Sequence, residues 1–166
     1  MPSHFPRSRR AGVLGVVGLA LLAGCYGGQG SEPELIIGTP DPEDELAFVP
    51  LEDGDDIPLQ TFGQGGTHAL LALRCIGLGQ EVFTTVTLEN AETGASESTP
   101  PSARPMLLIC RDEAETVCDL IPMFVLTGGI AAPEEKDGLA IRVVADAHNA
   151  AGLEASASLE GVLRRE

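Results

Sequence analysis

The chain contains no tryptophan, and its only tyrosine is Tyr26. Proteins that bind nucleic acid or polysaccharide by stacking need exposed aromatic rings, and this chain has few to offer. Positive charge is also scarce. Of the ten basic residues, Arg7, Arg9 and Arg10 precede Cys25, whereas all 25 acidic residues follow it, so the part after Cys25 carries a net charge of −18. This charge repels nucleic acid and anionic lipid surfaces, so we expect no nucleic-acid partner.

Recognisable catalytic patterns are missing as well. No G-x-S-x-G nucleophile elbow occurs, and Asp146 and His148 lie two residues apart without an identifiable nucleophile. A blue-copper site needs a Cys, two His and an axial Met, but no histidine lies between Cys118 and Met123. The sequence therefore predicts a protein that is not an enzyme and binds no metal or cofactor. His68 and His148 are expected in a turn or at the start of a strand.

Acidic residues form two short runs, PDPEDE at 40–45 and EDGDD at 52–56. A calcium site needs six to eight oxygen ligands, usually from a loop of defined length. The spacing D-x-[DN]-x-[DN]-G-x5-E that provides them is absent. We therefore expect ordinary acidic turns. A calcium or small-ligand carrier that uses these loops is the alternative function.

The N-terminus has the pattern of a secretory signal. Residues 1–10 contain three arginines and no acid, and residues 11–24, AGVLGVVGLALLAG, carry no charge. A helix of 14 residues is about 21 Å long, which is short of the roughly 30 Å hydrocarbon core of a bilayer. A basic segment followed by a short apolar one predicts a helical signal peptide at residues 1–24 rather than a membrane span.

The end of this segment, Leu22-Ala23-Gly24-Cys25, resembles the bacterial lipobox at every position. The resemblance implies that the Cys25 thiol receives a diacylglycerol, that the signal is cut before Cys25, and that the new amine is acylated. Several acyl chains anchor a protein stably to membrane lipid. In proteobacteria, a residue other than Asp after the cysteine implies sorting to the outer membrane, and Tyr26 stands there. The resemblance thus implies a lipid-anchored protein of the cell envelope.

Residues 25–33 are expected to form the acylated cysteine and a flexible tether. The segment 27–33, GGQGSEP, is rich in glycine and polar residues and has no large apolar side chain to pack. A linker of about ten residues spans roughly 15–20 Å on average. The remaining residues, 34–166, would then form one domain just clear of the lipid headgroups.

This domain is expected to consist of strands, because apolar and polar residues alternate along it with period two. The segments 138–146 and 153–163 predict a C-terminal hairpin around the turn 146–152, with Ile141 and Val143 facing inward and Leu153 beginning the apolar face of the second strand. Further strands are predicted at 34–38, 46–51, 57–62, 68–75, 81–89, 104–110 and 118–128.

Pro122 lies inside the predicted strand 118–128 and cannot donate to a ladder, so this strand should be an edge strand or carry a bulge. Outside the signal, no stretch of twelve residues has a helical stripe. Many short strands separated by turns predict an all-β domain, an antiparallel β-sandwich with immunoglobulin-like topology. A jelly roll is the alternative.

A second resemblance concerns GQGGTH at 63–68, which follows an Asp-Gly-Asp turn and precedes an apolar strand. This arrangement is similar to uncharacterised small lipoproteins of myxobacterial type with an immunoglobulin-like domain. That family brings no known activity, so the resemblance implies only a fold and a compartment.

Three cysteines remain if Cys25 is lipidated, and the envelope is an oxidising compartment in which disulfides form. Cys110 and Cys118 flank a polar loop of seven residues between two predicted strands. Closing this loop would add roughly 2.5 kcal/mol, so a Cys110–Cys118 disulfide is favoured. Cys75 should then be a buried free thiol, with bridges from Cys75 to either partner as alternatives. The sequence predicts a lipid-anchored module that binds an envelope protein or has a structural role.

Overall fold

The computed structural model describes residues 32–62, 66–98, 104–112, 114, 116–127 and 133–165. The predicted signal peptide and Cys25 lie outside these residues. The strands are β1 (Glu34–Pro40), β2 (Phe48–Pro50), β3 (Asp56–Thr61), β4 (Thr67–Ile76), β5 (Glu81–Asn90), β6 (Arg104–Leu107), β7 (Ile109–Cys110), β8 (Val117–Leu126), β9 (Ala140–His148) and β10 (Glu154–Arg165). One short helix, α1, spans Pro133–Lys136. The all-β prediction is confirmed, and each predicted strand segment contains a strand.

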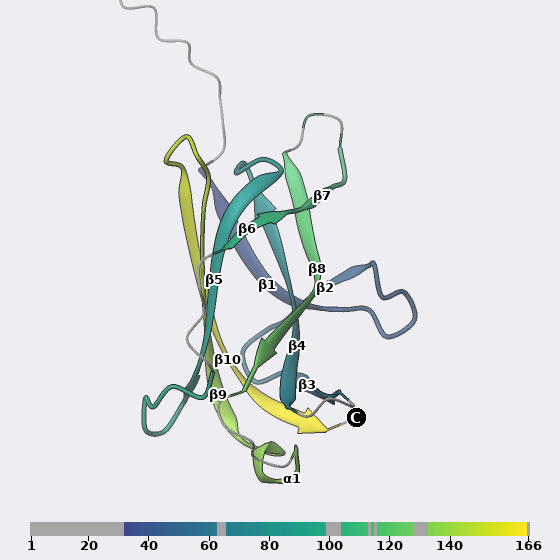
Figure 1. Cartoon of the computed structure of the whole chain (residues 1–166), viewed down its shortest axis with the longest axis vertical. Helices are drawn as coiled ribbons and strands as arrows, with labels where there is room; N and C mark the ends of the chain where they lie inside the picture. The colour runs from purple at the N-terminus through teal and green to yellow at the C-terminus, as the bar shows by residue number, and fades with distance from the viewer. Residues whose placement is uncertain are drawn as a thin grey trace, which may run out of the picture.

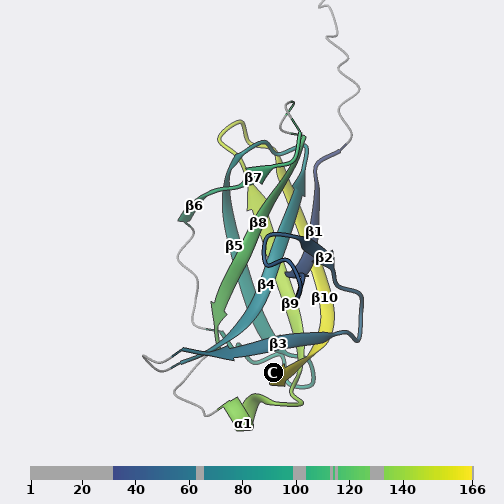
Figure 2. The same ribbon diagram turned by 90° about the vertical axis from the view of Figure 1, so that its right-hand side faces the viewer.

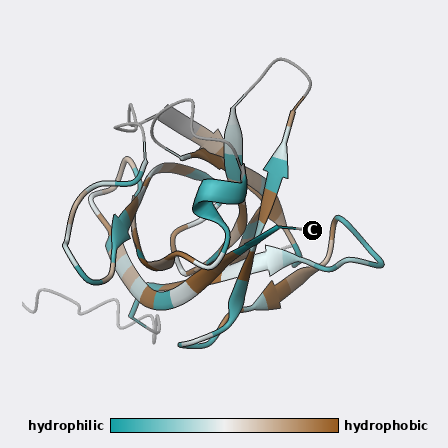
Figure 3. Ribbon diagram, turned by 90° about the horizontal axis from the view of Figure 1, so that it is seen from below, coloured by the Kyte–Doolittle hydropathy of each residue, from teal (hydrophilic) through white to brown (hydrophobic). Residues whose placement is uncertain are grey.

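The arrangement of the strands differs from the predicted sandwich. They form one mixed, curled sheet in the order β2-β1-β4-β3-β10-β9-β5-β6, and β8 lies along the other edge of β4. The sheet is a half-barrel, and the curl is visible from below in Figure 3. β3 and β10 run parallel, with Asp56 opposite Val162. A purely antiparallel sandwich, immunoglobulin-like or jelly roll, is therefore not confirmed.

The C-terminal hairpin is confirmed. β9 and β10 are antiparallel neighbours: His148 lies opposite Glu154 at one end of the pairing and Ala140 lies opposite Val162 at the other. Ile141 and Val143 are fully buried, as the alternation of apolar residues predicts. β9 continues to His148, so the turn is shorter than predicted. Leu153 precedes β10 in this turn and is 45% exposed, so its predicted place on the buried face is wrong.

The core fills the concave side of the sheet. β4 contributes every second residue of its apolar run, and Ala69, Leu71, Leu73 and Cys75 are all buried, as predicted from the sequence. Side chains from β3, β5, β9 and β10 meet them there; the largest are Ile57, Leu88, Ile141 and Leu163. The alternation of apolar residues along each strand thus directs one continuous core to the inside of the curl.

The outer side of β4 is covered in part by the β1–β2 hairpin. Leu70 and Ala72 face outward by their position in the strand, yet both are buried. β2 folds back along β1, and Phe48 packs so closely that a Cβ atom on Gly38 would lie 2.6 Å from its ring. Only glycine fits at position 38. The hairpin therefore creates a small second packing layer on the outer face.

The half-barrel has two distinct ends (Figures 1 and 2). The upper end in Figure 1 contains the start of β1, the start of β8 and the β9–β10 turn. The lower end contains α1 and the ends of β8 and β10.

Between the two ends, the register of the β4–β8 pairing shifts between Leu71 and Leu73, next to Pro122, which confirms the predicted bulge. No helix among the described residues is long and apolar enough to cross a membrane.

Candidate functional site

A groove of about 280 Å³ lies between the β1–β2 loop and strands β3, β4 and β8. Its apolar lining consists of four prolines and two larger side chains, namely Pro40, Pro42, Pro58, Pro122, Leu70 and Phe124. Leu70 is buried, whereas Phe124 is 43% exposed. Concave, mostly apolar surfaces with a few polar groups are typical ligand and peptide sites. We refer to this feature as the proline groove.

The proline groove exists because β4 changes partner along one edge. β1 pairs with β4 as far as Ala72, and β3 begins to pair only at Ala69. Between them, the carbonyl of Leu70 accepts a hydrogen bond of 3.3 Å from the Thr39 hydroxyl. Prolines lack the N–H that a ladder requires, so the prolines beside this gap cannot close it with strand pairing. The local sequence thus leaves a hollow in an otherwise continuous sheet.

Polar groups of the proline groove lie mainly on the β1–β2 loop. Asp41 and Glu45 line it together with the neutral side chains of Thr39 and Gln60. The Asp41 carboxylate accepts a hydrogen bond from the Glu43 amide at 2.7 Å, which fixes the loop. Among the residues that the structure describes, none of those lining the groove is basic. An occupant with a positive charge would therefore be favoured over a negative one.

An aromatic patch, which we define as Phe62, His68, Phe124 and Leu126, continues from the proline groove to the lower end. Phe62 lies edge-on to both His68 and Phe124, with ring centroids 5.0 Å apart in each case. Phe62, Phe124 and Leu126 are all exposed. The His68 Nδ1 atom is buried and finds no hydrogen-bond partner among the described residues. The patch enlarges the apolar surface around the groove.

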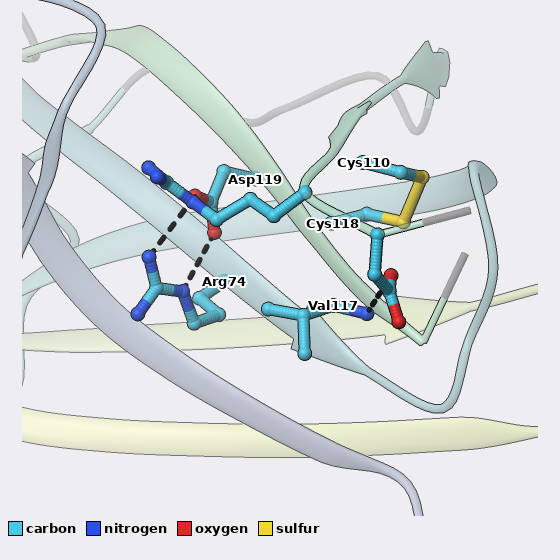
Figure 4. A network of polar contacts seen from close by, with 7 residues as sticks. Arg74, Cys110, Val117, Cys118 and Asp119 are labelled. Atoms are coloured by element: carbon cyan, nitrogen blue, oxygen red, sulfur yellow. Dashed lines mark hydrogen bonds and ion pairs between the residues drawn. A yellow bond between two sulfur atoms is a disulfide. The ribbon is translucent and has the colours of Figure 1, made fainter. Parts of the chain in front are cut away.

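Asp119 forms the second notable cluster, on the upper half of β8 (Figure 4). Its carboxylate accepts hydrogen bonds from Arg74 at 2.8 and 3.1 Å and from Arg111, although it is only 2% exposed. The Arg74 guanidinium lies 4.3 Å from the centroid of the Phe48 ring. Burial by itself raises the pKa of Asp119, but the hydrogen bonds and charges of the two arginines outweigh burial and lower it. All three charges are paired, so this cluster stabilises the fold.

The predicted disulfide residues are adjacent in space. Cys110 and Cys118 occupy opposed positions on β7 and β8, and their sulfur atoms are 2.10 Å apart in a disulfide. Cys75, on β4, is the free and buried thiol that its place on an apolar strand face predicts. It lies opposite Cys118 of β8. Burial, together with the charge of Asp119, raises the pKa of Cys75 to about 12. The alternative bridges from Cys75 are not formed.

The acidic runs stabilise turns. The Asp53 carboxylate accepts from the Glu160 amide at 2.9 Å, and Asp55 accepts from the Glu52 amide at 2.8 Å. Asp56 forms an ion pair of 3.0 Å with Arg164. Within the part of the chain that the structure describes, no three His, Cys, Asp or Glu side chains are grouped around a position for a metal ion. Asp53, Asp55 and Asp56 thus each have a hydrogen-bond or ion-pair partner within the protein.

The residues considered for hydrolysis are placed apart from these sites. Asp146 and His148 lie on the exposed face of β9, and the His148 ring stacks on Phe83 with centroids 5.1 Å apart.

A comparison with family models, curated proteins and solved structures finds no match.

Sequence reasoning missed the proline groove and the Asp119 cluster. The groove residues come from four separate segments, so no local pattern joins them. The sequence does contain an indication of the ion cluster, because Arg74 and Asp119 are each the single charged residue of an apolar strand. Two opposite charges placed in neighbouring buried strands need each other as partners.

Proposed function

We propose that the chain is a lipid-anchored protein of the cell envelope, held at the outer membrane by acylated Cys25. Its β domain is a non-catalytic module that binds another envelope protein. The observation that carries the anchoring is the sequence Leu22-Ala23-Gly24-Cys25, which follows an uncharged segment too short to span a bilayer. The polar residues that follow Cys25 suit a tether.

The proline groove supports the binding part of the proposal. It combines apolar walls with Asp41 and Glu45, and it joins the exposed rings of Phe62 and Phe124. An extended protein segment with apolar side chains and a lysine or arginine complements this surface in shape and charge.

Anchoring is tested by labelling cells with radioactive palmitate. The natural chain should incorporate label and run as the processed form. Cys25→Ser should remain an unlabelled precursor, because it lacks the thiol that forms the thioether. Equal labelling of both proteins would refute the anchoring proposal.

Binding is tested by photocrosslinking in intact cells. A benzophenone side chain at Phe124, in the proline groove, should capture a defined envelope protein. The matched control carries the same group at Ser158, which is exposed on β10 and does not line the groove. Capture of the same proteins from both positions, or of none from Phe124, would contradict a specific site at the groove.

A further inference from the structure

The upper end exposes three aliphatic side chains, Leu107 in β6, Ile109 in β7 and Leu153 in the β9–β10 turn. Leu107 is 67% exposed and Ile109 is 59% exposed. Large apolar side chains exposed together in a small domain usually mark a contact surface. We call these three residues the upper apolar patch.

The exposure of Leu107 and Ile109 is built into the fold. Leu108 between them is 1% exposed and belongs to the core, and its amide donates a hydrogen bond of 3.0 Å to the Gln80 carbonyl. Because successive side chains of an extended segment point in opposite directions, burial of Leu108 directs both neighbours outward. Their exposure follows from a fixed backbone.

The β9–β10 turn lies next to β6. A hollow of about 240 Å³ is lined by Leu107 and Met106, by Glu81, Val82 and Phe83 of β5 and, from the turn, by Ala150. The turn is tied to the β4–β5 connection, because the Asn149 side chain donates to the Leu78 carbonyl at 2.9 Å. Leu153 therefore belongs to the same end of the half-barrel as the other two residues of the patch.

The tether joins the domain at this same end. Glu34, the first residue of β1, pairs with Ile76, which in turn pairs with Val117 at the start of β8. Figures 1 and 2 show the start of β1 and the β9–β10 turn at the same end of the half-barrel. The segment from Cys25 to Glu34 spans at most about 30 Å when fully extended, and roughly half that distance on average. An anchor at Cys25 therefore keeps the upper end close to the bilayer.

The charges around the upper apolar patch select the kind of lipid. Glu34, Glu81, Asp112 and Glu154 are exposed at this end, whereas the charge of Arg111 is paired with Asp119. Acidic groups are repelled by anionic headgroups. The surface thus suits zwitterionic lipid, whose interface accepts aliphatic side chains without this repulsion.

We propose that Leu107, Ile109 and Leu153 form a membrane-contact surface that rests on zwitterionic lipid beside the anchor. This inference rests on the proposed lipid anchoring of Cys25. With the upper end against the bilayer, the proline groove and the aromatic patch face away from it and are open to a protein partner. The contact thus orients the binding module.

Tryptophan fluorescence tests the contact, because the natural chain contains no tryptophan. Leu107→Trp is made in the full-length, acylated protein and reconstituted into phosphatidylcholine vesicles with brominated acyl chains. The matched control is Leu46→Trp, since Leu46 is 65% exposed and lies in the β1–β2 loop away from the upper end. Apolar residues that insert at the interface reach the headgroup–acyl boundary, so Leu107→Trp should be quenched roughly twofold more than Leu46→Trp.

Flotation of the vesicles separates this inference from the anchoring on which it rests. If neither variant floats with the lipid, the proposed anchoring has failed. If both float and are quenched equally, the anchoring holds and the membrane contact is refuted. Ile109→Trp provides an independent probe of the same surface and should behave like Leu107→Trp.

Discussion

The two halves of the β4–β8 pair are held together in different ways. In the upper half, Cys118 and Asp119 are almost fully buried, one in a disulfide and the other between two arginines. In the lower half, Phe124 and Leu126 are exposed, and the described side chains of the pair form no ion pair or disulfide there. The register shift at Leu71/Leu73 separates the halves.

This contrast indicates a division of roles along one pair of strands. Along the β4–β8 pair, the disulfide and the ion pairs of the described side chains lie near the proposed membrane end, where the edge strand β7 is short. The lower half is held by the strand ladder, by packing and by the Thr127 hydroxyl, which donates to the Thr67 carbonyl at 2.8 Å, and it leaves its aromatic side chains accessible beside the proline groove. Rigid support at one end of an element and an open apolar surface at the other suit a scaffold that presents a binding site.

The largest expected effect is the loss of Asp119. Asp119→Ala leaves Arg74 and Arg111 without their shared partner, and breaking a buried ion pair on one side costs about 3–5 kcal/mol. Urea unfolding followed by circular dichroism measures the change. Arg111→Ala is the control, because Arg111 is 45% exposed and exposed pairs contribute only about 0–1 kcal/mol. Equal losses in both variants would contradict the role assigned to burial.

The contribution of Asp119 should also depend on pH. Its pKa is lowered in the folded protein, so the carboxylate stabilises the fold above its unfolded-state pKa, and this stabilisation is lost as the pH falls through the folded-state pKa. Unfolding free energies of the natural chain and Asp119→Asn should therefore differ at pH 7 and converge in strongly acidic solution. A difference that stays constant down to pH 2 would show that charge is not responsible.

The disulfide should contribute less than Asp119. Cys110→Ser opens the loop between Cys110 and Cys118, and the loss of loop closure is worth roughly 2.5 kcal/mol. Thermal or urea unfolding of the variant measures it, and the natural chain under reducing conditions should show a loss of similar size. No change in either experiment would mean that the loop is held by its other contacts, such as the Asp112 carboxylate that accepts from the Thr116 amide at 2.9 Å.

In the lower half, Phe124→Ala should cost only about 1–2 kcal/mol. Phe124 is 43% exposed, and its edge-on contact with Phe62 adds about 0.5–1.5 kcal/mol beyond area burial. Capture of the envelope partner should nevertheless be lost, because the ring lines the proline groove. Thermal melts and pull-downs measure the two effects separately. Full partner capture by a folded Phe124→Ala protein would place the binding site elsewhere.

Local pattern was sufficient to predict most elements of this fold. Alternating residues located the strands, and Cys110 and Cys118 could be paired because a short polar loop separates them. The partner of each strand was harder to predict. β3 and β10 are distant in sequence, and their parallel pairing depends on Gly161, where a Cβ atom would lie 2.7 Å from the Ile57 side chain.

The outer face of β4 was hard to predict for the same reason. Leu70 and Ala72 have the spacing of solvent-facing residues, but a hairpin from another part of the chain covers them. The proline groove arises where this cover ends, so it depends on contacts between segments far apart in sequence. In the sequence, only a lone charged residue such as Arg74 within an apolar strand indicates that the outer face of β4 is covered by other parts of the chain.

The smallest expected effect concerns Cys75, which should report on opening of the upper half without changing its stability. In the native protein this thiol should react slowly with iodoacetamide, because it is 1% exposed and its pKa is raised to about 12. The thiolate is the reacting form, so the rate should continue to rise about tenfold per pH unit above pH 9, where an ordinary thiol levels off. Mass spectrometry of peptides, with the protein in urea as the fully reactive control, measures the rate. Rapid labelling at pH 7, or recovery of a disulfide-linked Cys75 peptide, would show that the upper half is less securely closed than the comparison with the lower half implies.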